Sequence, residues 1–88
     1  GKINSTNINQ ISLRNSIEIF PNPVKNILTI NTNKELTKAT LIYDITGKIV
    51  KNINKTELSF SLNELDKGVY FIQLSLEKEI VTKKFIKN

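Results

Sequence analysis

The stretch that most constrains the fold of this 88-residue chain is residues 70–77, YFIQLSLE. Apolar side chains recur there at every second position and would share one face of an extended chain: Tyr70, Ile72, Leu74 and Leu76. A period of two is typical of a strand with one buried face. The turn-forming residues 66–68 precede this strand, and a polar break at residues 77–79 follows it. Residues 80–87 are therefore predicted to return as an antiparallel partner strand.

Upstream of this hairpin, five further short strands are predicted. They cover residues 17–20, the neighbourhood of Leu28 and Ile30, residues 39–45, residues 48–53, and the alternating Leu58, Phe60 and Leu62. Residues 62–67 fit a single helical turn at most, and no longer segment shows helical periodicity. Strands spaced by about 8 to 12 residues with turn residues between them are typical of sandwiches. The sequence predicts an all-β fold, a seven-stranded antiparallel immunoglobulin-like β-sandwich with Greek-key connections.

The first two turns have definite chemistry. In Pro21-Asn22-Pro23 neither proline can donate a backbone hydrogen bond, and Asn22 is kept out of the helical region, so a rigid, extended corner is expected. In the turn that begins at Asp44, the carboxylate is expected to cap its own backbone. Gly47 can adopt the positive φ of a bulged hairpin before Lys48 begins the next strand.

A third turn surrounds Gly68, where we also expect a positive φ. The spacing Asp66-x-Gly68-x-Tyr70 fits a tyrosine corner, in which the hydroxyl binds backbone a few residues upstream. An ordinary half-buried tyrosine explains the same spacing equally well.

Residues 80–87 put a lysine on the buried face in either register. If Val81 and Phe85 face inward, Lys83 lies between them; if Ile80 and Ile86 face inward, Lys84 does. Lysines of this kind protect an exposed sheet edge from unwanted pairing, and their aliphatic stems can reach out to solvent. The alternative is that they form a recognition surface.

Composition argues against catalysis and against cofactor binding. The chain has no cysteine and no histidine, which removes the commonest nucleophile, general base and metal ligands. Asp44 and Asp66 lie in turns, where capping explains them, and no calcium loop, phosphate loop or metal-ligand spacing occurs. We expect no enzyme activity, no cofactor, no metal and no small-molecule substrate.

The net charge of +5 comes almost entirely from scattered lysines, since Arg14 is the only arginine. Nucleic-acid readers favour arginine and interleave aromatic residues with their basic patches. We therefore expect no nucleic-acid partner. No apolar run approaches the length of a membrane-spanning helix.

Residues 1–15 are rich in Asn, Ser and Thr and lack a sustained period, so they are expected to form a flexible linker ahead of a domain at residues 16–88. The alternative is an edge strand at residues 8–13, where Ile11 and Leu13 alternate. Because the chain begins with Gly1 and carries no signal peptide, we expect it to be a fragment of a longer protein.

With these motifs in order, residues 17–88 resemble the type A C-terminal sorting domain of type IX (Por) secretion cargo. The resemblance rests on the corner Pro21-Asn22-Pro23, on residues 43–48 (YDITGK), on the spacing of Leu65, Gly68 and Tyr70, and on a terminal strand with Lys83, Lys84 and Lys87. One departure is the hairpin at residues 77–79, where family members often carry a glycine. That departure puts the type of turn in question.

The resemblance implies a sorting signal at the C-terminus of a larger secreted protein. Such a signal folds in the periplasm, is recognised by the type IX translocon and crosses the outer membrane with its covalently linked N-terminal cargo, which ends at the cell surface or is secreted. A sortase-like cysteine protease at the surface then removes the signal. Cleavage is expected before Ile17.

The main contact with the translocon is expected at the terminal residues Lys83, Lys84, Phe85, Ile86, Lys87 and Asn88, because they combine charge with an exposed edge. Gly47 and Gly68 are expected to serve folding. The domain is expected to be a monomer. An alternative function is an immunoglobulin- or fibronectin-like adhesion or carbohydrate-binding module, although sugar platforms usually expose tryptophan, which this chain lacks.

Overall fold

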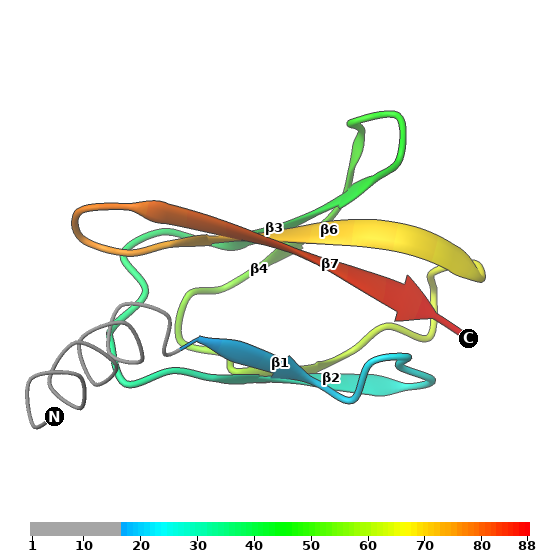
Figure 1. Ribbon diagram of the computed structural model, residues 1–88, viewed down its shortest axis with the longest axis horizontal. Coiled ribbons are helices and arrows are strands. Elements are labelled where there is room, and N and C mark those ends of the chain that lie inside the picture. The colour runs from blue at the N-terminus through cyan, green and yellow to red at the C-terminus, as the bar shows by residue number, and fades with distance from the viewer. Residues whose placement is uncertain (1–16) are drawn as a thin grey trace, which may run out of the picture.

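The computed structural model describes residues 17–88, which form two antiparallel β-sheets packed face to face (Figure 1). One sheet has the order β1-β2-β5, with β1 at Glu18–Phe20, β2 at Ile27–Asn31 and β5 at Ser59–Ser61. The other has the order β4-β3-β6-β7, with β3 at Thr40–Asp44, β4 at Ile49–Ile53, β6 at Gly68–Ser75 and β7 at Ile80–Lys87. The predicted all-β sandwich of seven strands is confirmed.

The order of the strands shows where the chain changes sheets. It crosses from one sheet to the other after β2, after β4 and after β5. The pairs β1–β2, β3–β4 and β6–β7 are consecutive antiparallel neighbours. The Greek-key description of the connections remains a prediction. Nowhere in residues 17–88 does a helix occur that is long and apolar enough to cross a membrane.

The hydrophobic core lies between the sheets and follows the alternation that the sequence predicts. In β6 the side chains of Tyr70, Ile72 and Leu74 are buried while the intervening ones are more exposed. Both sheets and several connections contribute fully buried side chains: Val24, Leu28, Ile42, Leu62, Ile72, Leu74 and Phe85. Val24 and Leu62 lie outside the strands and at the same end of the sandwich, so the connections there cover one end of the core.

Two predicted strand assignments need correction. Leu58 was expected to share the buried face with Phe60 and Leu62, but it precedes β5 and is 40% exposed. The reason is its position beyond the last registered pair of β2 and β5, Thr29 with Ser59. The strand β6 also begins two residues earlier than expected, at Gly68, and ends at Ser75.

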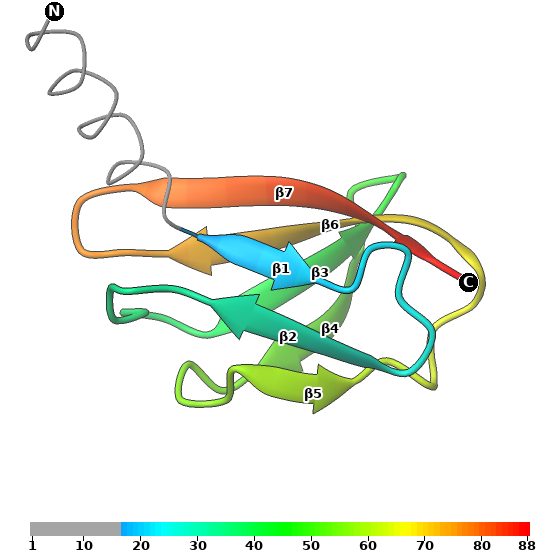
Figure 2. The ribbon, with the colours of Figure 1, turned by 60° about the horizontal axis from the view of Figure 1, so that its bottom comes forward.

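The edges of the two sheets decide which backbone is accessible. The strands β1 and β7 are edge strands of different sheets, and Figure 2 shows both of them on the side of the sandwich that is uppermost in that view. Residues of both strands line one groove, so these two edges face the same side of the molecule. The predicted linker at residues 1–15 and the alternative strand at residues 8–13 lie outside the described residues.

Candidate recognition surface

The strand β7 carries five of the six residues predicted to contact the translocon, and its alternation divides them between two faces. Phe85 is fully buried and Lys87 is 8% exposed, whereas Lys84, Ile86 and the terminal Asn88 are exposed. Lys83 is half-buried on the inner face. The six residues therefore do not form one continuous surface, because neighbouring side chains of a strand point in opposite directions.

The two registers left open by the sequence are resolved by this burial pattern. Val81, Lys83 and Phe85 occupy the inner face, so the inward lysine is Lys83 and not Lys84. A second inward lysine, Lys87, donates a hydrogen bond from Nζ to the carbonyl oxygen of Asn88 at 3.3 Å. Its aliphatic stem is buried at the end of the sandwich while its charged end meets a backbone acceptor.

The outer backbone edge of β7 is closed along its C-terminal half. The amide nitrogen of Val24 donates to the carbonyl oxygen of Ile86 at 2.8 Å, and the amide nitrogen of Asn88 donates to the carbonyl oxygen of Val24 at 2.8 Å. These two bonds accompany an isolated parallel bridge between Val24 and Lys87. The chain segment after β1 thus occupies the place of a neighbouring strand.

The side chain of Asn22 extends this closure by one step. Its Oδ1 accepts a hydrogen bond from the amide nitrogen of Ile86 at 3.0 Å, and its Nδ2 donates a longer one to the carbonyl oxygen of Lys84 at 3.4 Å. The predicted corner at residues 21–23 is present as a series of bends, with cis peptide bonds before both Pro21 and Pro23. The sequence did not predict that this corner binds the edge of β7. We call the hydrogen bonds from Asn22 and Val24 to β7 the clamp.

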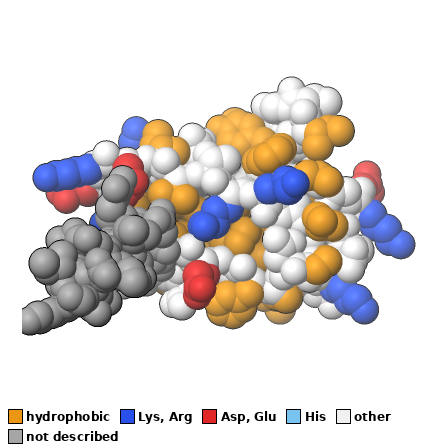
Figure 3. Space-filling view, viewed as in Figure 1, with side chains coloured by type: hydrophobic (Ala, Val, Ile, Leu, Met, Phe, Trp, Pro, Cys, Tyr) orange, Lys and Arg blue, Asp and Glu red, His pale blue; other side chains and the backbone are white. Residues whose placement is uncertain are grey.

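A groove of about 470 Å³ lies between the edges of β1 and β7. It is lined by Ile17, Glu18, Ile19, Phe20, Asn22, Lys83 and Lys84. Two lysines and one glutamate line the groove, so its net charge is positive. The only ion pair among residues 17–88 joins Lys51 to Glu64, elsewhere on the molecule. Figure 3 shows lysine side chains between hydrophobic ones on the side where β7 faces the viewer in Figure 1.

The turn at Asp44 has the predicted chemistry. Asp44 Oδ1 accepts hydrogen bonds from the amide nitrogen and the hydroxyl of Thr46, at 2.8 and 2.6 Å, and from the amide nitrogen of Lys48 at 3.1 Å. The Thr46 hydroxyl is the main reason why the pKa of Asp44 is lowered. Gly47 has a φ of 88°, and the register of β3 and β4 shifts between Ile42 and Tyr43, as expected for a bulged hairpin.

Tyr70 forms the tyrosine corner, which decides between the two interpretations of its spacing. Its hydroxyl donates to the carbonyl oxygen of Asp66 at 2.7 Å, and burial raises the pKa of the phenol. The ring stacks on Phe85 with centroids 5.7 Å apart and planes at 22°. Leu65 is buried in the same corner, and Gly68 has a φ of 153°. The corner therefore packs directly against the terminal strand.

The hairpin at residues 77–79 needs no glycine. The amide nitrogen of Leu76 donates to the carbonyl oxygen of Glu79 at 2.8 Å, and no residue other than glycine has a positive φ within residues 17–88. The departure from the family pattern therefore leaves a hairpin connection between β6 and β7 in which no residue has a positive φ.

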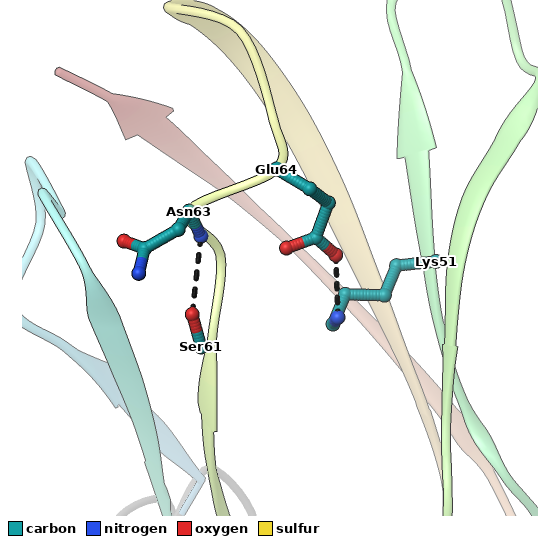
Figure 4. Close-up of polar contacts among 4 residues, drawn as sticks. All are labelled: Lys51, Ser61, Asn63 and Glu64. Carbon is teal, nitrogen blue, oxygen red and sulfur yellow. Dashed lines mark hydrogen bonds and ion pairs between the residues drawn. The ribbon is translucent and has the colours of Figure 1, made fainter.

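Two further polar contacts were not predicted from the sequence. Lys51 of β4 forms an ion pair with Glu64, which lies on the connection between β5 and β6, and the amide nitrogen of Asn63 donates to Ser61 Oγ at 3.2 Å (Figure 4). The hydrogen bond from Lys51 is the main cause of the lowered pKa of Glu64. Nothing in the spacing of Lys51 and Glu64 indicates that they meet, because the contact depends on how the sheets pack. Across residues 17–88, no three acidic side chains gather in a way that could hold a metal ion.

Comparisons with known proteins bear on the family and on the fold. The family described as "Secretion system C-terminal sorting domain" matches residues 18–88. None of the curated proteins compared with the chain matches it. Among solved structures, a similar one is that of PorZ, described as an essential bacterial surface component of the type-IX secretion system of human oral-microbiomic Porphyromonas gingivalis.

The similarity to PorZ has a TM-score of 0.66 at 18% sequence identity and covers 88% of this chain. It covers only 12% of the PorZ chain, so the comparison concerns one small part of that protein. At this level of identity the similarity shows the fold.

Proposed function

The chain belongs to the family of secretion system C-terminal sorting domains, and from this membership we propose that it directs an attached cargo protein across the outer membrane through the type IX secretion system. The observation that carries the proposal is the family match, which covers residues 18–88 and therefore all but one of the described residues. The fold shared with part of PorZ, itself described as a surface component of that system, supports the same proposal.

The recognised feature in this proposal is the terminal segment Lys83 to Asn88. Its exposed side chains, Lys84, Ile86 and Asn88, are the ones that the translocon can contact directly. Phe85 and Lys87 are buried, and their role is to fix the segment on the sandwich. A folded domain offers such a segment in one conformation, which reduces the entropy lost on binding.

In transit the domain is folded in the periplasm and joined through residues 1–15 to its cargo. After export, a sortase-like cysteine protease removes the domain by cleavage before Ile17, and the cargo remains at the cell surface or is released. The domain is the substrate in that reaction and not its catalyst. It acts as a monomer and needs no cofactor.

The test is export of a foreign periplasmic protein fused to residues 1–88 in a bacterium with a type IX system. We expect the fusion at the cell surface or in the medium, and N-terminal sequencing of the released domain should place the cut before Ile17. A fusion that stays in the periplasm would contradict the sorting function, and glycan binding without export would favour the alternative module.

The terminal segment is best tested with point substitutions. Deletion of residues 85–88 would remove the fully buried Phe85 and so confound recognition with folding. The double variant Lys84→Glu with Ile86→Ser changes two exposed side chains and should reduce export strongly. Lys55→Glu, which changes another exposed lysine, in the turn between β4 and β5, is the control for the charge change and should be exported normally.

A further inference from the structure

The part of the β7 edge that remains open lies before the terminal residues. Because Ile86 binds the Asn22 side chain and Val24 with its backbone, its backbone groups point away from β6. Backbone groups of an edge strand alternate in direction, so those of Ile80, Thr82 and Lys84 also point outward. The register supports this alternation, since Leu76 and Glu79 form the hydrogen-bonded end of the hairpin and Ser75 opposes Ile80 in the next pair.

These outward groups lack partners within the described residues up to the point where the clamp begins. Only the carbonyl oxygen of Lys84 is reached, by the long bond from Asn22 Nδ2. Both backbone groups of Ile80 and of Thr82 and the amide nitrogen of Lys84 are left without a hydrogen bond to any of residues 17–88. An edge with a row of unpaired donors and acceptors is a template for an additional strand.

Side chains around this open segment define what such a strand should carry. Lys83 and Lys84 line the groove at the end of the open segment next to Asn22, and neither has a carboxylate partner within residues 17–88. Phe20, which is 46% exposed, provides apolar surface in the same groove. An extended segment with alternating apolar and acidic side chains complements both features.

We propose that residues 80–84 of β7 are a strand-addition site for an extended, acidic segment of a partner protein in the export machinery. This proposal rests on the proposed sorting function and locates the backbone contact ahead of the terminal residues. The clamp by Asn22 and Val24 sets the end of the added strand, because its backbone already occupies the edge from Ile86 onward.

The binding test uses the full 88-residue chain, labelled with ¹⁵N and followed by NMR. The probes are a short peptide in which valine and glutamate alternate and a second in which valine and lysine alternate. We expect the first peptide to shift the amides of Ile80, Thr82 and Lys84 most, and to bind between about threefold and tenfold more tightly than the second. Equal affinities, or shifts centred elsewhere on the domain, would overturn the proposal.

Two substitutions with one control test the edge itself. Thr82→Pro removes an outward amide hydrogen and no hydrogen bond to β6, so binding should be lost. Thr82→Val keeps that hydrogen and should bind normally. If Thr82→Pro fails to fold, Lys84→Glu is the deciding variant. It should reverse the preference for the glutamate peptide over the lysine peptide, and an unchanged preference would overturn the proposal.

Two results obtained before any peptide is added would also overturn it. Amide shifts of Thr82 that depend on protein concentration would show that a second copy covers the edge. Nuclear Overhauser contacts from residues 8–13 to Thr82 would show that the chain covers its own edge.

Export assays separate this proposal from the sorting function. If the fusion to residues 1–88 is exported and the Thr82→Pro and Lys84→Glu fusions are exported equally well, strand addition is wrong and the sorting function stands. If the unmodified fusion stays in the periplasm, the sorting function is wrong whatever the peptide titration shows.

Discussion

At the scale of single residues, the side chains of two sequence motifs bind the backbone of their own turns. Asp44 accepts three hydrogen bonds from Thr46 and Lys48, and the Tyr70 hydroxyl donates to the carbonyl oxygen of Asp66. A side chain that satisfies backbone groups fixes a turn without any tertiary partner. Their presence in the motifs is therefore explained by folding, and the contacts proposed for recognition lie elsewhere.

Substitution of Tyr70 by phenylalanine should lower the free energy of unfolding by about 1 to 2 kcal/mol, because the buried corner loses its hydrogen bond and leaves the Asp66 carbonyl without that donor. Tyr43→Phe is the matched control. Its hydroxyl donates to Gln73 Oε1 at 2.8 Å on a half-buried surface, where water can replace it. Urea unfolding should show a smaller loss, below about 1 kcal/mol, for Tyr43→Phe. Equal losses would contradict the corner.

The turn at Asp44 predicts how stability changes with pH. Its pKa in the folded chain is below the ordinary value of 3.8, so folding favours the carboxylate, and the stabilisation is complete above that value. It is lost as the pH falls through 3.8 towards the lower folded pKa. Asp44→Asn keeps an acceptor at Oδ1 but does not titrate. Between about pH 6 and pH 3, Tm should therefore fall less for Asp44→Asn than for the unsubstituted chain. If Tm falls equally in both proteins, Asp44 does not contribute to the pH dependence of stability.

At the scale of strands and turns, the alternation of residues 70–77 was sufficient to predict the buried face of β6, because a strand in the middle of a sheet is limited to one register by its apolar side chains. The bulged hairpin was predictable for a local reason as well, since Gly47 and Asp44 determine the turn by themselves. The register of β7 was not predictable, because either Lys83 or Lys84 can lie on the inner face until the packing of Phe85 against Tyr70 is known.

The clamp on β7 could not be predicted from the sequence either. Asn22 and Val24 are more than sixty residues from Ile86, and no periodicity links a corner residue to the edge of the other sheet. Such contacts depend on the relative placement of the two sheets, which local patterns do not contain. For the same reason, the terminal residues could be proposed as a recognition segment, but their division into buried and exposed members could not.

The clamp can be tested by hydrogen exchange. Asn22→Ala removes the acceptor of the Ile86 amide, so this amide should exchange between about fivefold and tenfold faster. Asn22→Asp keeps the acceptor and should leave the Ile86 amide protected. The Asn88 amide, bound to the carbonyl oxygen of Val24, is the internal reference and should change less. Unchanged exchange at Ile86 in Asn22→Ala would show that the side chain does not hold the strand.

At the scale of the whole domain, the two sheets differ in how firmly they should be held. The central strands β3 and β6 of the four-stranded sheet contain fully buried Ile42, Ile72 and Leu74, whereas β1 and β5 are three-residue edge strands. We expect the hydrogen-bonded amides of β3 and β6 to exchange only through global unfolding and those of β1 and β5 through smaller openings. Exchange rates that respond equally to urea in both sheets would show a single opening unit.

The first and the last described segments of the domain share a seam. The backbone of Val24 is bonded to Ile86 and to Asn88, so the segment that leads in from the N-terminal side and the segment that leads out at the C-terminal side fasten each other. The C-terminal residues therefore cannot leave the sandwich without breaking the hydrogen bonds that also hold the segment after β1. A pulling force applied to the C-terminal residues would thus be transmitted directly to the segment around Val24.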